Sequence, residues 1–267
     1  MTELFLAEPF LSLWAGRDPF AAAEALDGKV FRELDGRRTL RTEVAEHPYF
    51  VKTHRGVGWL EIFKNLLSLR LPIIGARNEW EAIRRLHELG VGTMVAVAYG
   101  TRGLNPAQRQ SFLITEELSS TINLEDFCRD WKNQPPLAKI KHALIGKVAE
   151  LARKMHGGGV NHRDFYLCHL RLSLPIPPDT EDLKLSVLDL HRAHIRAEVP
   201  RRWRDKDLAA LHFSSLEIGL TRRDRLRFLR AYFARPLRAI LRDEQDLLAF
   251  LAREGLRLQE RFQRKFA

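Results

Sequence analysis

The stretch Val160-Asn161-His162-Arg163-Asp164-Phe165-Tyr166-Leu167-Cys168-His169 carries more information about the fold than any other part of the chain. It places one carboxylate, Asp164, directly after His162 and Arg163, and it ends on a histidine. The tripeptide alone is weak evidence, because the chain is rich in arginine. It gains weight only if a lysine, a glutamate and a second aspartate stand in the right order around it.

The spacing resembles the catalytic loop of protein kinases, H-R-D-x-x-x-x-N. There the aspartate accepts the proton of the attacking hydroxyl and the asparagine holds a metal ion. Asp164 stands at the aspartate position, and we predict that it is the catalytic base. His169 stands at the asparagine position, so the metal site of such a loop would be altered here.

Two short apolar stretches supply further charged groups in kinase order. Tyr49-Phe50-Val51-Lys52 is aromatic and β-branched, as a strand would be, and ends in Lys52, which we expect to reach the ATP phosphates. Leu185-Ser186-Val187-Leu188 predicts a buried strand that presents Asp189 at its end. A carboxylate is a hard oxygen ligand, so Asp189 is predicted to hold Mg²⁺.

A helix is expected over residues 78–90, where two glutamates compete to pair with Lys52. Glu79 shares the apolar face with Ile83 and Leu86, so its carboxylate needs a partner. Glu81 has Arg85 four residues on and is better interpreted as half of a surface pair. We predict Glu79 as the partner of Lys52. The alternative is a surface glutamate without a role.

The segment Ser111-Phe112-Leu113-Ile114-Thr115-Glu116-Glu117-Leu118 is predicted to be a strand that leads into the hinge of a kinase. In that register Thr115 is the gatekeeper. Glu116 and Leu118 would offer backbone groups to adenine. Because backbone groups make such contacts, side-chain identity says little about them.

Composition and charge narrow the class of protein. The chain has 267 residues, 45% of them apolar, which predicts a folded bilobal unit or two small domains. No apolar run approaches the roughly 18 residues of a membrane span, and the acidic start is unlike a signal peptide, so we expect a cytoplasmic protein. A net charge of +10 predicts an anionic partner: nucleic acid, a membrane face or an acidic glycolipid. We find no RNA-binding, zinc-finger or basic-zipper pattern and expect no nucleic acid.

Two basic segments have alternative interpretations. Residues 55–75 form a basic amphipathic insert that would lie on a bilayer surface or pack on the sheet. The Arg-rich residues 221–242 also carry apolar side chains and are predicted to be a core helix with a solvated basic face.

The histidines could instead form a zinc site, but their spacing matches no H-E-x-x-H pair and no cysteine pair supports it. Cys168 as a nucleophile is less favoured still, because its setting is that of a small core residue.

The motifs together resemble the lipopolysaccharide kinase family, and within it the core heptose(I) kinases of Gram-negative bacteria. The fragments that carry the resemblance are V-N-H-R-D, L-D-L-H-R-A and K-D-L-A-A-L, at residues 160–164, 188–193 and 206–211. Across nearly the whole chain the resemblance implies an α+β, bilobal, protein-kinase-like fold. An antiparallel-sheet N-lobe would span residues 1–118 and a helical C-lobe residues 119–267.

The resemblance also implies an activity. The γ-phosphate of ATP would pass to a hydroxyl of the first heptose of the lipopolysaccharide inner core, at the cytoplasmic face of the inner membrane. Lys52 would neutralise charge on the phosphates, and Glu79 would hold Lys52 in place. Asp164 would orient the acceptor hydroxyl and take its proton, and Asp189 would hold the metal. Asp207 would brace the backbone of the catalytic loop. The implied partners are the glycolipid and the anionic membrane surface. The basic charge leaves open an acidic protein, rather than a lipid headgroup, as a further partner.

The chain departs from the kinase pattern at two places. The phosphate-covering region 32–39 has one glycine, and Arg37 and Arg38 would have to replace missing backbone contacts. His169 replaces the asparagine; imidazole suits Mn²⁺ better than Mg²⁺, so His169 either ligates a metal or hydrogen-bonds a phosphate.

Alternative functions are a kinase for another lipopolysaccharide sugar (Kdo-type) or for protein hydroxyls. A non-catalytic basic module that binds membrane or nucleic acid is an alternative of another class.

Overall fold

The computed structural model describes residues 2–34, 36–56, 58–59 and 75–266. The chain divides into two compact units. Unit 1 comprises Met1–Arg84 and Met94–Ser119, and unit 2 comprises Arg85–Thr93 and Ser120–Ala267. Most of the basic insert expected at 55–75 lies outside the described residues.

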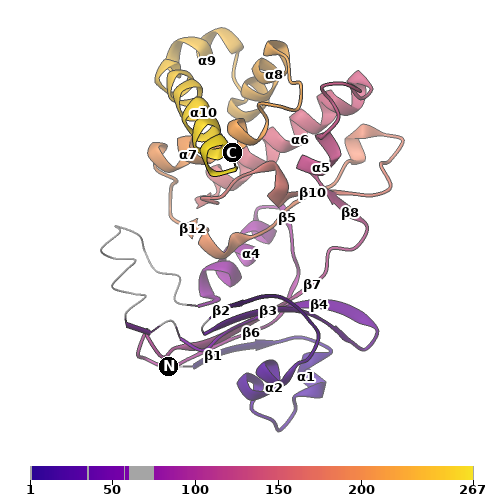
Figure 1. Cartoon of the computed structure of the whole chain (residues 1–267), viewed down its shortest axis with the longest axis vertical. Coiled ribbons are helices and arrows are strands. Elements are labelled where there is room, and N and C mark those ends of the chain that lie inside the picture. Colours follow the sequence, from indigo (N-terminus) through magenta and orange to yellow (C-terminus); the bar gives the residue numbers. More distant parts are fainter. Residues whose placement is uncertain (1, 35, 57, 60–74, 267) are drawn as a thin grey trace. The chain divides into compact units, whose positions relative to one another are not determined.

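Unit 1 is built on a six-stranded antiparallel sheet (Figure 1). Its order is β1 (Thr2–Leu6), β6 (Ala96–Arg102), β7 (Gln110–Glu116), β4 (His47–His54), β3 (Arg37–Val44) and β2 (Lys29–Leu34). The helices α1 (Phe10–Leu13) and α2 (Pro19–Ala25) cover one face. Asp18 caps α2 by accepting the Phe20 N–H, and Pro19 fits the first helical position.

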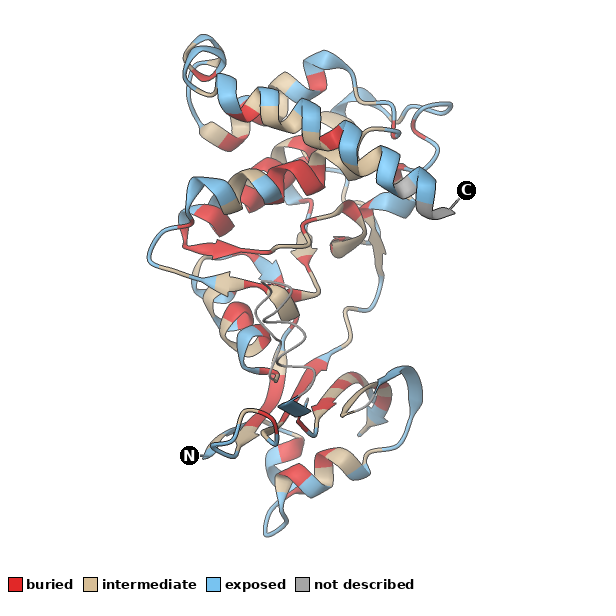
Figure 2. Cartoon of the chain, turned by 60° about the vertical axis from the view of Figure 1, so that its left-hand side comes forward, coloured by how far each residue is buried: buried red, intermediate tan, exposed pale blue. Residues whose placement is uncertain are grey.

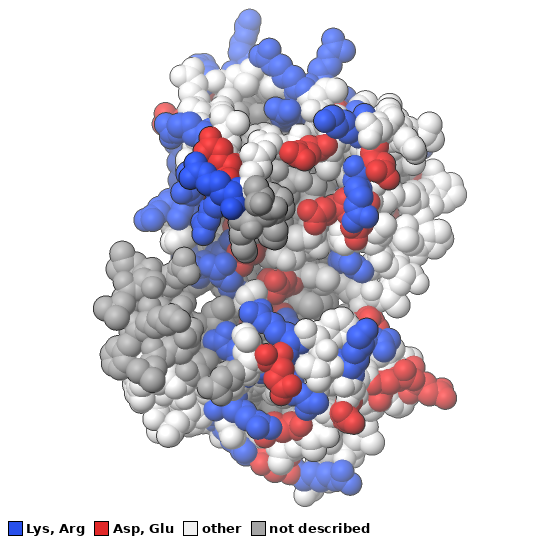
Figure 3. Space-filling model, viewed as in Figure 1, with Lys and Arg blue, Asp and Glu red and all other residues white. Residues whose placement is uncertain are grey.

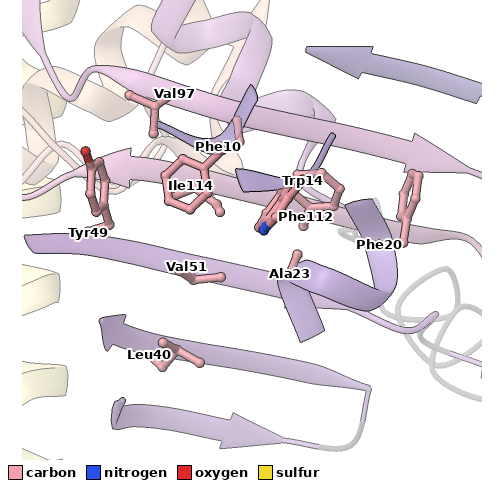
Figure 4. Close-up of a cluster of buried hydrophobic side chains, with 11 residues drawn as sticks. Phe10, Trp14, Phe20, Ala23, Leu40, Tyr49, Val51, Val97, Phe112 and Ile114 are labelled. Atoms are coloured by element: carbon pink, nitrogen blue, oxygen red, sulfur yellow. The ribbon is translucent and has the colours of Figure 1, made fainter. Parts of the chain in front are cut away.

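The core of unit 1 lies between its sheet and these two helices. Figure 4 shows the cluster, in which aromatic rings from the helical segment meet side chains from β3, β4, β6 and β7. Phe10 packs edge-on against Tyr49 with ring centroids 5.1 Å apart, and Phe20 packs likewise against Phe112 at 5.2 Å. Large buried rings contribute most to such a core.

Strand alternation decides which residues face away from this cluster. Tyr49 and Val51 of β4 point into it, so Lys52 lies on the opposite face, opposite Leu113 of β7. The helix α4 (Arg77–Glu88) covers that face, where Trp80 stacks on Tyr99 at 4.9 Å with an interplanar angle of 6°. The sheet and α4 therefore bring Lys52 and the start of α4 together.

Unit 2 is mostly helical. Its main helices are α5 (Leu124–Cys128), α6 (Ala138–Gly157), α7 (Arg201–Ser214), α8 (Arg222–Phe233), α9 (Leu237–Asp243) and α10 (Gln245–Phe266). Figure 2 shows buried positions along these helices. On α6 they fall at helical spacing, as at Leu144, Val148, Leu151 and Met155.

Small sheets and turns carry the loops of unit 2. A four-stranded sheet has the order β5 (Gly92–Thr93), β11 (Leu185–Val187), β10 (Leu170–Ser173) and β8 (Thr121–Asn123). The strands β9 (Val160–Asn161) and β12 (His194–Ile195) pair separately. The 3₁₀ turns are η1 (Leu167–His169), η2 (Thr180–Asp182) and η3 (Leu190–Arg192).

The Arg-rich segment 221–242 forms two helices, α8 and α9, rather than one. Ala234 adopts the left-handed conformation after α8, and Pro236, which has no N–H to donate, precedes α9. Leu229, Tyr232 and Ile240 are buried while several arginines are exposed, so the predicted pairing of a core face with a basic face is confirmed. Among the described residues, no helix is long and apolar enough to cross a membrane.

Candidate active site

In unit 1, Lys52 and Glu79 form an ion pair of 2.7 Å between Nζ and Oε1. Glu79 is 2% exposed and lies in the first turn of α4, where the helix dipole favours a negative charge. A carboxylate so deeply buried requires a charged partner. The choice of Glu79 over Glu81 as the partner of Lys52 is confirmed. The role of this pair in ATP binding stays a prediction.

The expected surface pair of Glu81 was wrong in its partner. Glu81 pairs with Arg77 at 2.7 Å, one turn back along α4, whereas Arg85 pairs with Glu88 at 3.0 Å. Both arrangements use neighbouring turns of one helix, so spacing alone does not choose between them.

The predicted hinge begins where β7 ends. Thr115 is buried, and Glu116 is the last residue of the strand, with its N–H donated to the carbonyl of Val95 at 2.9 Å. The next N–H, of Glu117, donates to Pro48. Leu118 follows outside the strand and is half-buried. The adenine contacts assigned to Glu116 and Leu118 stay predictions.

In unit 2, Asp207 of α7 holds the backbone of the predicted catalytic loop. Its carboxylate, 1% exposed, accepts the N–H groups of His162 at 2.6 Å and Arg163 at 2.8 Å. His156 lies 3.3 Å from the same carboxylate and bonds Tyr232 through its other ring nitrogen. The bracing role predicted for Asp207 is confirmed.

The loop itself is held in an uncommon conformation. Arg163 has φ +74°, in the left-handed region that residues other than glycine seldom adopt. His162 donates its Nε2–H to the carbonyl of Leu188 at 2.8 Å, and its Nδ1 accepts the N–H of Asp164. Burial lowers the pKa of His162, so the ring is neutral and joins the loop to the end of β11.

The Asp164 carboxylate is half-buried and is bound by Arg192. Nη1 of Arg192 lies 2.7 and 3.0 Å from its two oxygens. Arg192 comes from η3, three residues after Asp189 in the L-D-L-H-R-A run. Sequence reasoning missed this residue, although it stood in a motif already singled out.

Asp189 follows β11 by two residues and has φ +61° and ψ 52°, which again is left-handed. Strained backbone of this kind is concentrated at functional sites. One carboxylate oxygen lies 2.5 Å from Nδ1 of His191, and the other lies 3.5 Å from Nε2 of His169. His191, at the position of the glycine in the kinase D-F-G motif, was not predicted to contact the site.

His169 connects the two aspartates. Its Nδ1–H donates to the backbone carbonyl of Asp164 at 2.7 Å, so Nε2 is the nitrogen that faces Asp189. Burial works to lower the pKa of His169. The hydrogen bonds of Cys168 and the Asp164 carbonyl, with the Asp189 charge, outweigh burial and raise it to about 9. The ring therefore pairs with Asp189 as a cation at neutral pH when no metal competes.

The donor set fits a kinase metal. Mg²⁺ is commonly bound through one or two carboxylates, with phosphate oxygens and water completing the octahedron. Asp189 supplies one such carboxylate, and His169 offers a ring nitrogen, which suits Mn²⁺ better. Among the described residues, no group of three or more His, Cys, Asp or Glu side chains is placed to hold a metal by itself. Phosphate oxygens would have to supply the rest.

Comparison with known proteins decides the family. The sequence profile of the lipopolysaccharide kinase (Kdo/WaaP) family matches residues 21–232. The chain belongs to this family. The family resemblance read from its motifs is therefore confirmed.

Two curated relatives illustrate how closely family members match. One, from Pseudomonas aeruginosa, is 61% identical over 261 residues, covering 98% of this chain and 97% of the relative. Another, from Escherichia coli, is 55% identical over 260 residues, covering 97% and 98%. Both are named lipopolysaccharide core heptose(I) kinase WaaP.

A solved structure, WaaP in complex with acyl carrier protein, aligns with a TM-score of 0.86 and 57% identity. It covers 96% of this chain and 99% of the solved one. The predicted α+β, kinase-like fold class is confirmed.

Proposed function

We propose that this protein is a lipopolysaccharide core heptose(I) kinase, which transfers the γ-phosphate of ATP to a hydroxyl of the first heptose of the inner core. The observation that carries the proposal is the half-buried Asp164 carboxylate on a loop that Asp207 holds by two backbone hydrogen bonds. The names of relatives 55–61% identical over nearly the whole chain supply the acceptor.

Asp164 serves as the base in this proposal. The heptose hydroxyl attacks the γ-phosphorus, the bond from that phosphorus to the bridging oxygen breaks, and ADP leaves while Asp164 takes the proton. Arg192 does not prevent this. A carboxylate has about four lone-pair sites, so a hydroxyl can donate to Asp164 while Arg192 stays bound and fixes its orientation.

Lys52 and Glu79 serve the nucleotide. Lys52 places a positive charge for the phosphates, and the buried Glu79 restricts where that charge can go. The backbone groups of Glu116 and Leu118 are assigned to adenine, next to the buried Thr115. The sheet, α4 and the end of β7 thus assemble all the proposed nucleotide contacts within unit 1.

Asp189 and His169 would hold the metal. A bound Mg²⁺, or Mn²⁺, would neutralise charge on the β- and γ-phosphates. For His169 to ligate, its Nε2 must be deprotonated, whereas a protonated Nε2–H would donate to Asp189 or to a phosphate oxygen. Both roles proposed for His169 use the nitrogen that faces Asp189.

An acidic protein partner is part of the proposal. The solved neighbour is a complex with acyl carrier protein, and this chain has a net charge of +10. Unit 2 also contains an open pocket of about 280 Å³, lined mainly by apolar side chains of α5, α6, α7, α8 and α10, such as Leu144, Leu208, Phe228 and Leu248. An acyl chain carried by such a partner matches this lining. We also propose peripheral binding at the cytoplasmic face of the inner membrane.

One experiment tests the proposed function. The purified protein is incubated with ATP, Mg²⁺ and dephosphorylated lipopolysaccharide, and the phosphorylated sugar is identified by mass spectrometry. Asp164→Ala is expected to abolish transfer, whereas Asp182→Ala, which changes an exposed carboxylate of the same unit, is expected to leave it intact.

The alternatives predict other outcomes. Phosphate on an acidic sugar would favour the Kdo-type kinase, and labelled protein without labelled glycolipid would favour a protein kinase. Tight binding of oligonucleotides or vesicles without any transfer would favour the binding module. Transfer that persists in Asp164→Ala would overturn the assignment of the base.

A further inference from the structure

Four cationic side chains surround a single indole in unit 2. The ring of Trp203, on α7, has Lys206 Nζ at 4.6 Å from its centroid and the guanidinium carbons of Arg202 at 5.3 Å, Arg163 at 5.7 Å and Arg196 at 5.9 Å. We call this group the Trp203 cation cluster. Its members come from the catalytic loop, from the segment between β12 and α7, and from α7 itself.

Neutral groups, not carboxylates, hold the cluster. Arg163 lies 3.0 Å from Nε2 of His194, and Arg196 bonds the amide oxygen of Asn161. Within the described ranges of the chain, none of the four cations has a carboxylate oxygen within 4 Å, although 34 acidic residues are available in the sequence. The positive charge of the cluster is therefore not compensated by the protein at close range.

The pKa values of Arg163 and Lys206 reflect the positive charges that surround them. The pKa of Arg163 is lowered by burial first and then by the nearby charges of Arg192 and Arg196, which Asp164 opposes. Burial and then Arg202 lower the pKa of Lys206, while Glu254 is the main acid that opposes them. Cations that lower one another's pKa raise the energy of the unliganded protein.

The position of Arg202 at the start of α7 is electrostatically unfavourable for a cation. Arg202 lies in the first turn of α7, where the helix dipole disfavours a positive charge. Its neighbour Arg201 has Glu244 at 3.2 Å, but Arg202 has no such partner among the described residues. The N-cap, Pro200, makes no side-chain capping bond. Cation–π contact with Trp203 attracts these side chains but does not neutralise their charge, whereas an anionic ligand would.

Two residues, Arg163 and Arg192, connect the Trp203 cation cluster to Asp164. Arg163 directly precedes Asp164 in the chain, and Arg192, which lowers the pKa of Arg163, binds the Asp164 carboxylate at 2.7 Å. The Asp164 carboxylate also acts on the pKa of Arg163, so a molecule whose hydroxyl reaches Asp164 would place neighbouring groups near this member of the cluster. Arginine forks match carboxylates in bidentate geometry, and several cations together suit more than one acidic group.

We propose that the Trp203 cation cluster binds the carboxylates of acidic sugars that flank the reacting hydroxyl of the acceptor. This inference rests on the proposed function, because it assigns the acceptor to Asp164. It makes the enzyme selective for a heptose that carries acidic neighbours. An isolated heptose, or a neutral oligosaccharide with the same hydroxyl, would bind weakly.

The test compares two matched pairs of substitutions. Arg202→Gln with Lys206→Gln removes one arginine and one lysine of the cluster without touching the catalytic loop. Lys139→Gln with Arg153→Gln removes one arginine and one lysine that are exposed on α6 of the same unit. Each variant is assayed with a lipid-free acceptor oligosaccharide in two forms, one with intact carboxylates and one with carboxylates reduced to alcohols.

With the intact acceptor, the cluster variant is expected to raise KM about fivefold, while the KM for ATP and the α6 control stay at wild-type values. Reducing the carboxylates should raise the wild-type KM similarly, and the cluster variant should then match wild type. Added salt should shrink the difference, as for any exposed charge contact. Equal KM values for the cluster variant and wild type with the intact acceptor would overturn the inference.

A binding measurement separates this inference from the proposed function. Calorimetric titration of the intact and reduced oligosaccharides needs no phosphate transfer, and only the intact form should distinguish wild type from the cluster variant. That pattern without transfer would reject the kinase proposal and keep the carboxylate site. If the cluster variant lost binding to phosphatidylglycerol vesicles but bound the glycan normally, the cluster would be a membrane contact, contrary to this inference.

Discussion

Glu79 is the residue on which the proposed nucleotide contacts depend most. Its buried carboxylate faces Lys52 at 2.7 Å, so Glu79→Gln removes the charge that positions the lysine. We expect kcat/KM for ATP to fall about a hundredfold, because a misplaced lysine no longer meets the phosphates. Steady-state kinetics at varied ATP measure the loss, and a thermal melt verifies the fold.

Glu81→Gln is the matched control on the same helix. Glu81 is half-buried, with 44% of its side chain exposed, and pairs with Arg77 at the surface, so kcat/KM should change less than about twofold. If both variants lost activity equally, the effect would belong to α4 as a whole and not to the pair.

His169 is predicted to influence which metal ion the site prefers. If its Nε2 ligates, His169→Asn replaces a softer nitrogen with a hard amide oxygen, and the ratio of activity with Mn²⁺ to activity with Mg²⁺ should fall several-fold. Activity is assayed with each metal in turn at saturating ATP. An unchanged ratio would reject ligation and leave His169 as a hydrogen-bond donor to phosphate.

Sequence patterns predicted some of these contacts and could not predict others. The 3.6-residue period put Glu79 on the apolar face of its helix, and the motif resemblance assigned Asp207 to the loop; both contacts are present. The bond from Arg192 to Asp164 follows the left-handed residue Asp189, which stands directly before η3. A turn of that kind at a non-glycine residue leaves no periodic signal in the sequence.

At the scale of the helix, Asp224 determines how α8 begins and how it is joined to α6. It completes a capping box with Thr221, and Lys141 of α6 lies 3.0 Å from its carboxylate. Because Asp224 is buried, Asp224→Ala should lower the free energy of unfolding by about 2–3 kcal/mol. Asp243→Ala, at the exposed end of α9, should cost about 0.5 kcal/mol or less in the same urea titration.

The same carboxylate predicts a pH dependence. Burial works to raise the pKa of Asp224, but the Thr221 hydrogen bonds and the Lys141 charge outweigh it and hold the pKa below its usual range. A lowered pKa contributes stability above the unfolded value near 3.8, and that contribution is lost as the pH falls through the folded value. The stability gap between wild type and Asp224→Ala should be constant near neutrality and close at strongly acidic pH. A constant gap throughout would show that shape, not charge, is lost.

Sequence periodicity predicted which face of an element a residue occupies better than it predicted where the element ends. Alternation along β4 placed Lys52 opposite the aromatic cluster and could be read from Tyr49 and Val51. The division of the Arg-rich segment into α8 and α9 was missed, although Pro236 is visible in the sequence. Apolar spacing continues across the break, since Ile240 is buried as Leu229 and Tyr232 are, so periodicity alone suggested one helix.

For the molecule as a whole, the net charge bears on membrane binding, whereas the local charge of the Trp203 cation cluster bears on acceptor binding. Lys and Arg side chains project from both units (Figure 3), and the total is +10. A membrane surface attracts any exposed cation that lies within roughly the Debye length of 8–10 Å, so many basic side chains contribute to this attraction in small amounts. A sugar carboxylate bound at the Trp203 cation cluster responds to particular residues.

The two double variants separate these effects. Each removes two of many exposed positive charges, so neither should abolish sedimentation with phosphatidylglycerol vesicles, and salt should release all three proteins between about 50 and 300 mM. Phosphatidylcholine vesicles, which are neutral overall, should bind none of them. The acceptor KM should respond to Arg202→Gln with Lys206→Gln alone. If vesicle binding also discriminated between the variants, the membrane would be recognised by the cluster itself, and the proposed peripheral attachment and the proposed acceptor contact would compete for the same side chains.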